Sequence, residues 1–478
     1  MQIPFVGGAY LNRSSNLNIQ NCINLFPVIG SAAEQAKVPV SLRGTPGLTS
    51  IYRPIATTGL PVRAMYSIGT KLYAVIKEKV YSLTSAGVGA YIGDISTSTG
   101  YVSMESNGTQ VILVDGTSYG YIITIATDVM TVITDSDFPT ATSVTFQDGY
   151  FIVVKKGTQS IYISGLYDGN TWNALDFAAA EGRPDNLVAA LSNTTDLWLF
   201  GETSTEVFYN SGNSDFPFVR VGGALIDVGC AAIASPVKID GRMYWLSNTG
   251  RVCRAIGYQQ QYISTESIDY AIASYSVTSD AIGSTYTIDN STFYVLTFPT
   301  AGKTWVYDTV YEFWHEWSSY ITSNTYGRHR INCCVRLGVN WVIGDYDNGT
   351  IYKLDMTCFT DNTYLIKRQR TGQVINKDMN RVICHALEVD MEKGVGINTI
   401  VITDPGYDPQ VILTWSDDSG HTWSTAHTKS FGKYQDYKKS VIWRSLGQAR
   451  NRVYRLTITE PVKVEIFGLY AELEECLS

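Results

Sequence analysis

The sequence predicts an all-β protein, with a β-propeller of about seven blades followed by a C-terminal β-sandwich. The 478 residues include 32 Tyr and 41 Gly, residue types that are typical of strands and of tight turns. A strand–turn–strand pattern recurs along the chain until about Phe359, where longer alternating stretches replace it. Helical periodicity is scarce, and only Asp176–Gly182 and Ser267–Ser274 look locally helical.

Residues 1–59 are predicted to form an N-terminal arm and turn segment. This part of the chain is rich in Asn and shows weak apolar periodicity. We therefore expect an extended arm that packs across the propeller or across a neighbouring molecule. Its turn signal is the sequence Gly44, Thr45, Pro46 and Gly47, because Pro and Gly favour turn conformations.

Residues 60–359 carry the propeller repeats. Each repeat combines a short apolar strand, a polar turn and a second strand that ends in an aromatic residue. Equivalent positions lie roughly 39 to 50 residues apart, which is the period of a four-stranded blade. These positions are Leu72, Val111, Phe151, Leu197, Met243, Phe293 and Trp341. One blade cannot bury both of its faces but stacked blades can, so we expect about seven blades, give or take one. The alternative is a two-sheet sandwich of irregular length.

Residues 360–478 are predicted to form the β-sandwich. Apolar and polar residues alternate over several segments, and Gly, Pro and Asp turns separate them, as expected for strands with one buried face. The predicted strands are Val382–Val389, Asn398–Thr403, Gln410–Trp415, Arg452–Thr459 and Val462–Tyr470.

Residues 416–423 match the Asp-box pattern S-x-D-x-G-x-x-W, with Ser416, Asp418, Gly420 and Trp423 at the specified positions. Asp readily accepts hydrogen bonds from its own turn, so we expect Asp418 to hold a hairpin while Trp423 packs beneath it. Asp boxes recur in sialidase-like propellers, which use several copies together with an arginine cluster. A single copy outside the repeats favours a structural hairpin over a glycosidase marker.

No catalytic, cofactor-binding or metal-binding residues are predicted. His315 shares a strand face with Phe313 and Trp317, which favours a packed histidine over a metal ligand. Residues 345–349 begin like a calcium loop, but Met356 stands where a bidentate acid is required, so this segment is predicted to be a hairpin turn. Paired carboxylates can converge from distant positions, which leaves a glycosidase open as an alternative.

The formal net charge of −8 disfavours a protein that reads DNA sequence, because the surface as a whole does not attract phosphates. Positive charge gathers late in the chain, at Lys367, Arg368 and Arg370 and again between Lys433 and Arg455. Such clusters are solvated faces or contacts for an acidic partner. The eight cysteines are irregularly spaced, which indicates reduced thiols formed in a cytoplasm. No apolar run is long enough for a membrane span, so no membrane insertion is expected.

Two stretches resemble the packaged DNA stabilization proteins of short-tailed bacteriophages (podoviruses), which are tail accessory factors that form a tail nozzle. The N-terminal stretch comprises Asn21–Val28 and Leu42–Leu48. The C-terminal stretch comprises Thr414–Trp423, Val441–Gly447 and Arg450–Arg455, followed by a final strand over Val462–Leu473. The order and spacing of these motifs carry the resemblance. The propeller between them is similar to the family in architecture more than in residues.

The resemblance implies a non-enzymatic virion protein that is synthesised in the host cytoplasm and built into the phage tail. It implies a homo-oligomeric ring, expected to be a hexamer, below the portal adaptor protein. The ring would continue the DNA channel, help to retain packaged DNA, and contact the tail needle and the tailspike or tail fibre proteins. Packaged DNA would touch it only non-specifically, and no cofactor is implied. The alternatives are a sialidase-like or other carbohydrate-active propeller, such as a depolymerase, and a lectin-like binding propeller.

Overall fold

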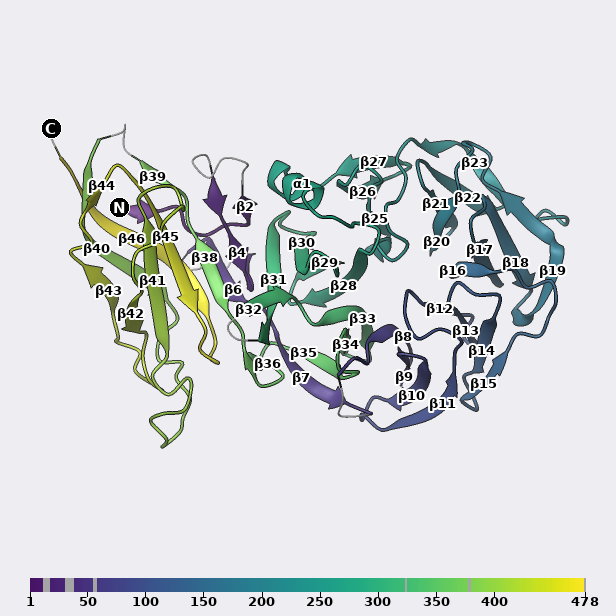
Figure 1. Ribbon diagram of the computed structural model, residues 1–478, viewed down its shortest axis with the longest axis horizontal. Coiled ribbons are helices and arrows are strands. Elements are labelled where there is room, and N and C mark those ends of the chain that lie inside the picture. Colours follow the sequence, from purple (N-terminus) through teal and green to yellow (C-terminus); the bar gives the residue numbers. More distant parts are fainter. Residues whose placement is uncertain (12–17, 31–37, 55–57, 323–324, 377–379, 477–478) are drawn as a thin grey trace.

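The computed structural model describes residues 1–11, 18–30, 38–54, 58–322, 325–376 and 380–476. A β-propeller and a β-sandwich lie side by side along the longest axis of the molecule (Figure 1). Within the described ranges the one α-helix is α1 (Glu266–Ala273), which confirms the helix predicted at Ser267–Ser274. No helix in this part of the chain has the length and apolar character needed to cross a membrane.

Six propeller blades are antiparallel sheets of four strands that follow one another in the chain. Each blade runs from an inner strand near the propeller axis to an outer strand at the rim (Figure 1). The strands are β8 (Val62–Ile68), β9 (Lys71–Ile76), β10 (Lys79–Thr84), β11 (Gly89–Asp94); β12 (Ser103–Ser106), β13 (Gln110–Val114), β14 (Gly120–Thr124), β15 (Val129–Val132); β16 (Ala141–Gln147), β17 (Tyr150–Lys155), β18 (Ser160–Gly165), β19 (Asp168–Ala179); β20 (Leu187–Asn193), β21 (Asp196–Gly201), β22 (Thr205–Asn210), β23 (Phe218–Ile226); β24 (Val237–Ile239), β25 (Arg242–Leu246), β26 (Val252–Ile256), β27 (Gln259–Tyr262); and β28 (Ile282–Ile288), β29 (Ser291–Phe298), β30 (Lys303–Asp308), β31 (Trp314–Thr322).

The last repeat does not form a blade by itself, so six blades of consecutive strands replace the expected number of about seven. It contributes β33 (Ile331–Leu337), β34 (Asn340–Asp345) and β35 (Ile351–Asp355), and β7 (Gly47–Tyr52) from the N-terminal segment pairs antiparallel with β35. Two short strands, β36 (Thr360–Asp361) and β37 (Tyr364–Leu365), extend this sheet. The repeat count from the sequence therefore included a composite sheet that two distant parts of the chain share.

Neighbouring blades bury apolar layers between their faces, which is why the repeats stack. Between the second and third blades, for example, Ile112 and Val114 pack with Phe151 and Val153, and all four are fully buried. The predicted helix at Asp176–Gly182 is wrong because this segment completes such a blade. It belongs largely to β19, where Phe177 pairs with Tyr162 across the sheet and stacks on its ring.

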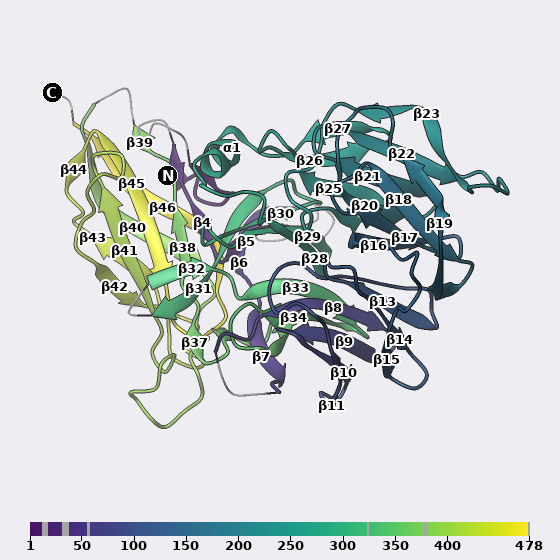
Figure 2. The same cartoon turned by 45° about the vertical axis from the view of Figure 1, so that its right-hand side comes forward.

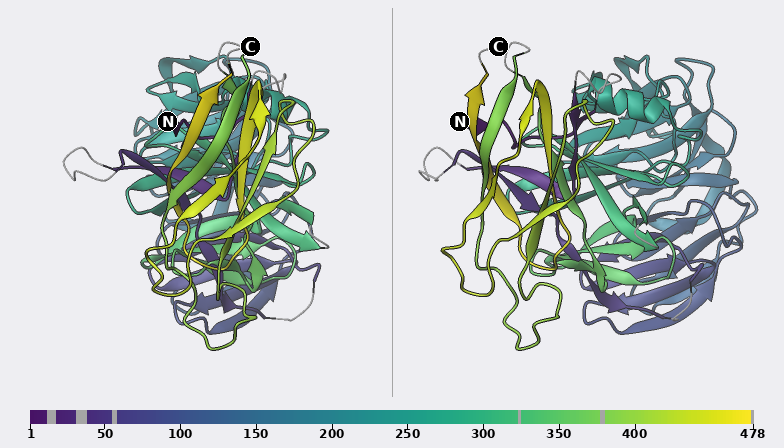
Figure 3. Two further views of the ribbon diagram at one scale, coloured as in Figure 1. Left: turned by 90° about the vertical axis from the view of Figure 1, so that its left-hand side faces the viewer. Right: turned by 60° about the vertical axis from the view of Figure 1, so that its left-hand side comes forward.

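The β-sandwich consists of two sheets to which both ends of the chain contribute (Figure 3). One sheet has the order β43-β40-β46-β6-β5, with β1 beside β46 and β44 beside β40. The other joins the sixth blade through β31-β4-β38-β45-β41-β42, with β32 beside β31 and β39 beside β45. The strands are β1 (Gln2–Ile3), β4 (Cys22–Ile23), β5 (Leu25–Ile29), β6 (Val40–Gly44), β32 (Thr325–Arg328), β38 (Arg368–Thr371), β39 (Ile375–Asn376), β40 (Val382–Met391), β41 (Gln410–Ser416), β42 (His427–Ser430), β43 (Val441–Arg444), β44 (Gln448–Ala449), β45 (Asn451–Ile458) and β46 (Glu465–Glu475); β2 (Tyr10–Leu11) and β3 (Ile19–Gln20) form a separate pair.

Four of the five strands predicted in the sandwich are present, as β40, β41, β45 and β46. The strand predicted at Asn398–Thr403 is wrong. That segment turns back on itself, because the Thr399 N–H donates to the carbonyl of Ile397 and the Asp404 N–H to that of Val401. Alternating apolar residues form a strand only where the backbone can hydrogen-bond to a neighbouring strand. Here the apolar side chains are exposed instead.

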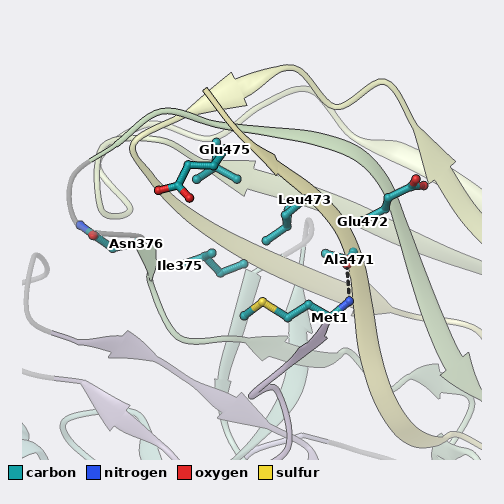
Figure 4. A pocket seen from close by; sticks show the side chains of 8 residues that line it. Met1, Ile375, Asn376, Ala471, Glu472, Leu473 and Glu475 are labelled. Carbon is teal, nitrogen blue, oxygen red and sulfur yellow. Dashed lines mark hydrogen bonds between the residues drawn. The ribbon is translucent and has the colours of Figure 1, made fainter. Parts of the chain in front are cut away.

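The N-terminal segment, predicted as an arm, joins both domains (Figure 2). β5 and β6 belong to a sandwich sheet, whereas β7 belongs to the propeller sheet of β35. The ammonium group of Met1 donates to the carbonyl of Ala471 at 2.7 Å, beside a pocket at the sandwich edge (Figure 4). The start of the chain is thereby attached to its last strand.

Gly47 lets β7 enter the propeller, and we predict that Gly47→Ala weakens this closure. A Cβ atom at this position would collide with the carbonyl oxygens of Cys358 and Thr360, which are backbone atoms with little freedom to move. We expect a loss of about 1–3 kcal/mol in the free energy of unfolding, measured with urea. Gly222→Ala is the control, because no heavy atom lies within 4 Å of its added Cβ. Equal losses in the two variants would contradict the prediction.

Candidate functional site at the junction of the two domains

Asn24 connects three parts of the chain at the junction of propeller and sandwich. Its side-chain amide donates to the carbonyls of Ser318 at 2.7 Å and of Lys367 at 2.8 Å, while its Oδ1 accepts from the Ser318 N–H at 2.9 Å. Its own carbonyl accepts from the Thr45 N–H at 3.1 Å. Asn24 has a φ of 52°, in the left-handed region that Asn tolerates better than most residues. One 2% exposed side chain therefore holds the sixth blade, the interdomain linker and the N-terminal segment together.

The turn formed by Gly44, Thr45, Pro46 and Gly47 leads the chain from the sandwich into the propeller. The Gly44 N–H donates to the carbonyl of Val464 in the sandwich, and the Gly47 N–H donates to the carbonyl of Cys358 at the end of the propeller. Neither glycine has a positive φ, so close approach explains them rather than backbone strain. A Cβ at Gly44 would lie 2.8 Å from the Nε of Arg368.

Arg368 lies beside this turn and is 1% exposed. Its Nη1 donates to the carbonyl of Glu460 at 3.2 Å, while Nε and Nη2 have no hydrogen-bond partner among the described residues. Burial lowers the pKa of Arg368 to about 10, and the nearby carboxylate of Asp361 opposes this shift. Asp361 is itself buried, which raises its pKa to about 6, although it accepts a hydrogen bond from Ser319.

Arg370 fixes the first residues of the chain through backbone carbonyls. Its Nε donates to the carbonyl of Phe5 at 2.7 Å, and its Nη1 donates to those of Gly8 at 2.6 Å and Asn21 at 3.1 Å. Its Nη2 donates to Oε1 of Gln20 at 2.6 Å. An irregular segment has few partners for its carbonyls, and the five N–H groups of one guanidinium supply several at once.

These positions correct the interpretation of Lys367, Arg368 and Arg370 as a solvated face or a contact for an acidic partner. Both arginines are buried, and Lys367 is half-buried with its amine 5.2 Å from the ring centre of Tyr326. The sequence shows only their charge. Arg368 donates to the carbonyl of Glu460, 92 positions away, and the acceptors of Arg370 lie 349 to 365 positions away, so no local pattern reveals them.

The Asp box forms a closed hairpin between β41 and β42 of the sandwich. Asp418 accepts hydrogen bonds from the N–H of Thr422 at 2.8 Å, the Thr422 hydroxyl at 2.6 Å and the Ser416 hydroxyl at 2.7 Å. The Gly420 N–H donates to Oγ of Ser416, and the indole N–H of Trp423 donates to the carbonyl of Gly420. All four motif residues thus hydrogen-bond within the hairpin itself.

Two arginines brace the Asp-box hairpin from β45. Arg452 forms a two-pronged ion pair with Asp417, at 2.6 and 2.8 Å, and the guanidinium of Arg455 lies 3.3 Å from the ring centre of Trp423. The Thr422 hydrogen bonds hold the pKa of Asp418 well below its usual range, so this carboxyl remains ionised at neutral pH. Its hydrogen bonds are all directed into its own turn.

The propeller axis holds a cavity of about 700 Å³ lined by the inner strands and the loops beside them. Arg63, at its wall, donates to the carbonyls of Lys77, Thr97, Thr99 and Gly100 at 2.6–2.9 Å. Because this guanidinium is engaged by the backbone, it is not presented to a substrate carboxylate.

The residues considered as metal ligands belong to the packed interior or to a turn. His315 is fully buried, 5.8 Å from the ring of Phe293, and burial lowers its pKa to about 3. Asp345 accepts from Arg330 at 2.9 Å and from the Asp347 N–H at 2.8 Å, in a hairpin turn as predicted. Among the described residues, no three His, Cys, Asp or Glu side chains are grouped closely enough to hold a metal ion.

Family models match nearly the whole chain. The model described as the β-propeller of bacteriophage P22 Gp10 matches residues 1–359, and the model described as its β-sandwich matches residues 367–474. The chain belongs to the P22 Gp10 family. This confirms the resemblance to packaged DNA stabilization proteins, and it identifies a phage structural protein with the two domains predicted.

Comparison with solved structures adds similarity to propellers at low sequence identity. The WD40 repeats of RRP9 align with a TM-score of 0.43 and 10% identity, covering 66% of this chain and 99% of that one. The WD40 propeller domain of Doa1 gives 0.40 and 11%, covering 62% and 93%, and the designed Ika8 protein gives 0.40 and 8%, covering 64% and 99%. No curated protein sequence matches the chain.

We predict that Asp418→Asn lowers the melting temperature at pH 7 and that the difference from the wild type becomes smaller in acid. The folded pKa of Asp418 is depressed, so its ionised form stabilises the hairpin above the unfolded pKa of about 3.8. This contribution is lost as pH falls through the folded pKa. Calorimetry at pH 7 and at about pH 2 checks this, and a difference that is constant with pH would contradict it.

We predict that Arg370→Met destabilises the fold by roughly 2–5 kcal/mol, because it leaves several buried acceptors without a donor. The N-terminal segment should loosen first. Hydrogen exchange at the Ala9 amide, which donates to the carbonyl of Trp314, should become faster. Arg336→Met, at an exposed arginine, is the control. Unchanged exchange and stability in Arg370→Met would contradict the anchoring role.

Proposed function

We propose that this protein is the tail nozzle subunit of a short-tailed bacteriophage. In this proposal it forms a ring, expected to be a hexamer, below the portal adaptor protein, where it extends and closes the DNA channel and stabilises the packaged genome. The ring would also support the tail needle and the tailspike or tail fibre proteins. Membership of the P22 Gp10 family carries the proposal.

The architecture supports a mechanical role. The N-terminal segment pairs with strands of both domains, and buried Asn24 and Arg370 connect it to the linker that follows the propeller. A subunit built in this way transmits force between its domains without a hinge at the linker. Such rigidity suits a part that has to resist the pressure of packaged DNA.

The charge of the chain fits a conduit for DNA better than a DNA-binding protein. A net charge of −8 per subunit gives phosphates no general electrostatic attraction, so DNA in the channel would slide past rather than adhere. Contact with packaged DNA would then be non-specific.

A carbohydrate-active propeller, such as a depolymerase, is the alternative function. Such an enzyme would present arginines and paired acids at the propeller axis. Here Arg63, in the axial cavity, is held by four backbone carbonyls. The single Asp box lies in the sandwich and is occupied with its own hairpin, which again favours a structural protein.

An infection that lacks this protein tests the proposal. We predict heads that fill with DNA normally but lose it after packaging, because packaging runs through the portal and only retention needs the extended channel. Sedimentation and electron microscopy count filled and empty heads. Heads that stay full and stable would refute the DNA-retaining role, and cleavage of a host polysaccharide by the purified protein would favour the depolymerase.

A further inference from the structure

Two loops at one end of the sandwich form a projecting lobe, defined here as residues 393–408 and 431–440. They follow β40 and β42 and extend beyond the ends of the sandwich strands (Figure 1). The loops hold each other, because the Gly394 N–H donates to the carbonyl of Phe431 and the Gln435 N–H donates to that of Gly394. A Cβ at Gly394 would lie 2.7 Å from the ring of Tyr437, so the two loops are in close contact.

The lobe exposes large apolar side chains at its surface. Ile400 is 98% exposed, Ile402 is 73% exposed and Tyr437 is 68% exposed, with Val401 and Tyr434 beside them in sequence. Single exposed apolar residues are common on proteins, but several on one lobe indicate a surface that a partner covers. This is also the segment whose apolar alternation predicted a strand that the structure does not contain.

Four lysines and three aspartates give the lobe a small positive charge, and two of the aspartates, Asp404 and Asp408, accept hydrogen bonds from Thr399 and Ser430. Lys433, Lys438 and Lys439 are exposed, and in the part of the chain that the structure describes none of them forms an ion pair with a carboxylate. Lys433 lies against Tyr407, with its amine 4.6 Å from the ring centre. A partner for this lobe should therefore combine an apolar patch with carboxylates.

Such a surface occurs on the opposite end of the same molecule, at the outer edge of the propeller. We call it the rim and define it by Val132, Asp137, Leu175, Asp176 and Phe177, on β15, on β19 and in the loop after β15. Leu175 is 80% exposed, and Val132 and Phe177 are 44% and 45% exposed. Asp137 accepts a hydrogen bond from the Ala174 N–H, so the loop and the strand form one surface.

A bulge in β19 makes this surface protrude from the blade. Tyr162 pairs with Phe177 and Ser164 with Trp172, so residues 173–176 all lie opposite Ile163. This bulge interrupts the open edge of the blade, which prevents unspecific strand pairing, and it presents Leu175 and Asp176 on a protrusion. Trp172 holds the start of this bulge in place, because its backbone N–H donates to the carboxylate of Asp135 and its ring packs edge-to-face on Phe138.

We propose that the lobe of one copy docks on the rim of a second copy. Ile400 and Ile402 would cover Leu175 and Phe177, while the lobe lysines would face Asp137 and Asp176. The lobe and the rim lie at opposite ends of the molecule in both views (Figures 1 and 2). Two different, complementary patches on one chain produce a head-to-tail contact, which closes into a ring when the rotation between copies allows it.

This inference rests on the proposed ring and adds the surfaces that build it. A second copy is favoured over an unrelated acidic protein because this chain itself carries the rim, which matches the lobe in apolar character and is opposite to its lysines in charge. It is favoured over an anionic membrane because the protein as a whole carries a charge of −8, which such a surface repels.

Mixing two variants tests the head-to-tail contact. The first is Ile400→Asp with Ile402→Asp, which disables the lobe, and the second is Leu175→Lys with Asp176→Lys, which disables the rim. Each variant alone should associate on the order of 100-fold more weakly than the wild type, because two isoleucines are no longer buried or two lysine clusters face each other. Their 1:1 mixture should form a dimer and no larger species, since one working lobe and one working rim remain.

Sedimentation velocity of the full-length protein over a range of concentrations measures these outcomes. Val339→Asp is the matched control, since Val339 is 84% exposed in the hairpin between β33 and β34, which belongs to neither patch, and it should assemble like the wild type. Circular dichroism confirms that each variant is folded.

Three results would overturn the inference. One is a wild type that remains monomeric at every concentration, and another is a lobe variant that forms the same rings as the wild type. In the second case the ring of the proposed function stands and only its surfaces are wrong. The third is flotation of the wild type, but not of the lobe variant, with phosphatidylglycerol vesicles, which would assign the lobe to a membrane.

Discussion

The fold depends on anchoring the N-terminal segment between the two domains. This segment has little regular structure, so its buried carbonyls need donors from elsewhere. Arg370 supplies them to Phe5, Gly8 and Asn21, and Asn24 joins the same segment to the sixth blade. A charge without a carboxylate partner is costly to bury, and here several charge-assisted hydrogen bonds offset that cost.

Because the N-terminal segment is anchored in this way, its strands complete both the propeller and the sandwich. The chain places β6 in a sandwich sheet, passes through the turn at Gly44–Gly47 and then places β7 against β35. Neither domain is complete without residues from the first 52 positions.

Much of the fold could be predicted from the sequence because blades and sandwich strands have local signatures. Residues such as Leu72 and Trp341 recur with the spacing of blades, and the Asp box specifies its own hairpin. The composite sheet could not be predicted, since β7 and β35 lie about 300 residues apart and only packing brings them together. Burial of Arg368 and Arg370 was missed for the same reason: their acceptors lie far away in the sequence, and most of them are backbone carbonyls.

We infer that the N-terminal segment makes propeller and sandwich one mechanical unit. Differential scanning calorimetry of the intact protein tests it most directly. We expect a single unfolding transition whose calorimetric and van't Hoff enthalpies agree, because loss of the shared segment opens both domains. Two resolved transitions, one for each domain, would show that propeller and sandwich are stable independently and would contradict the claim.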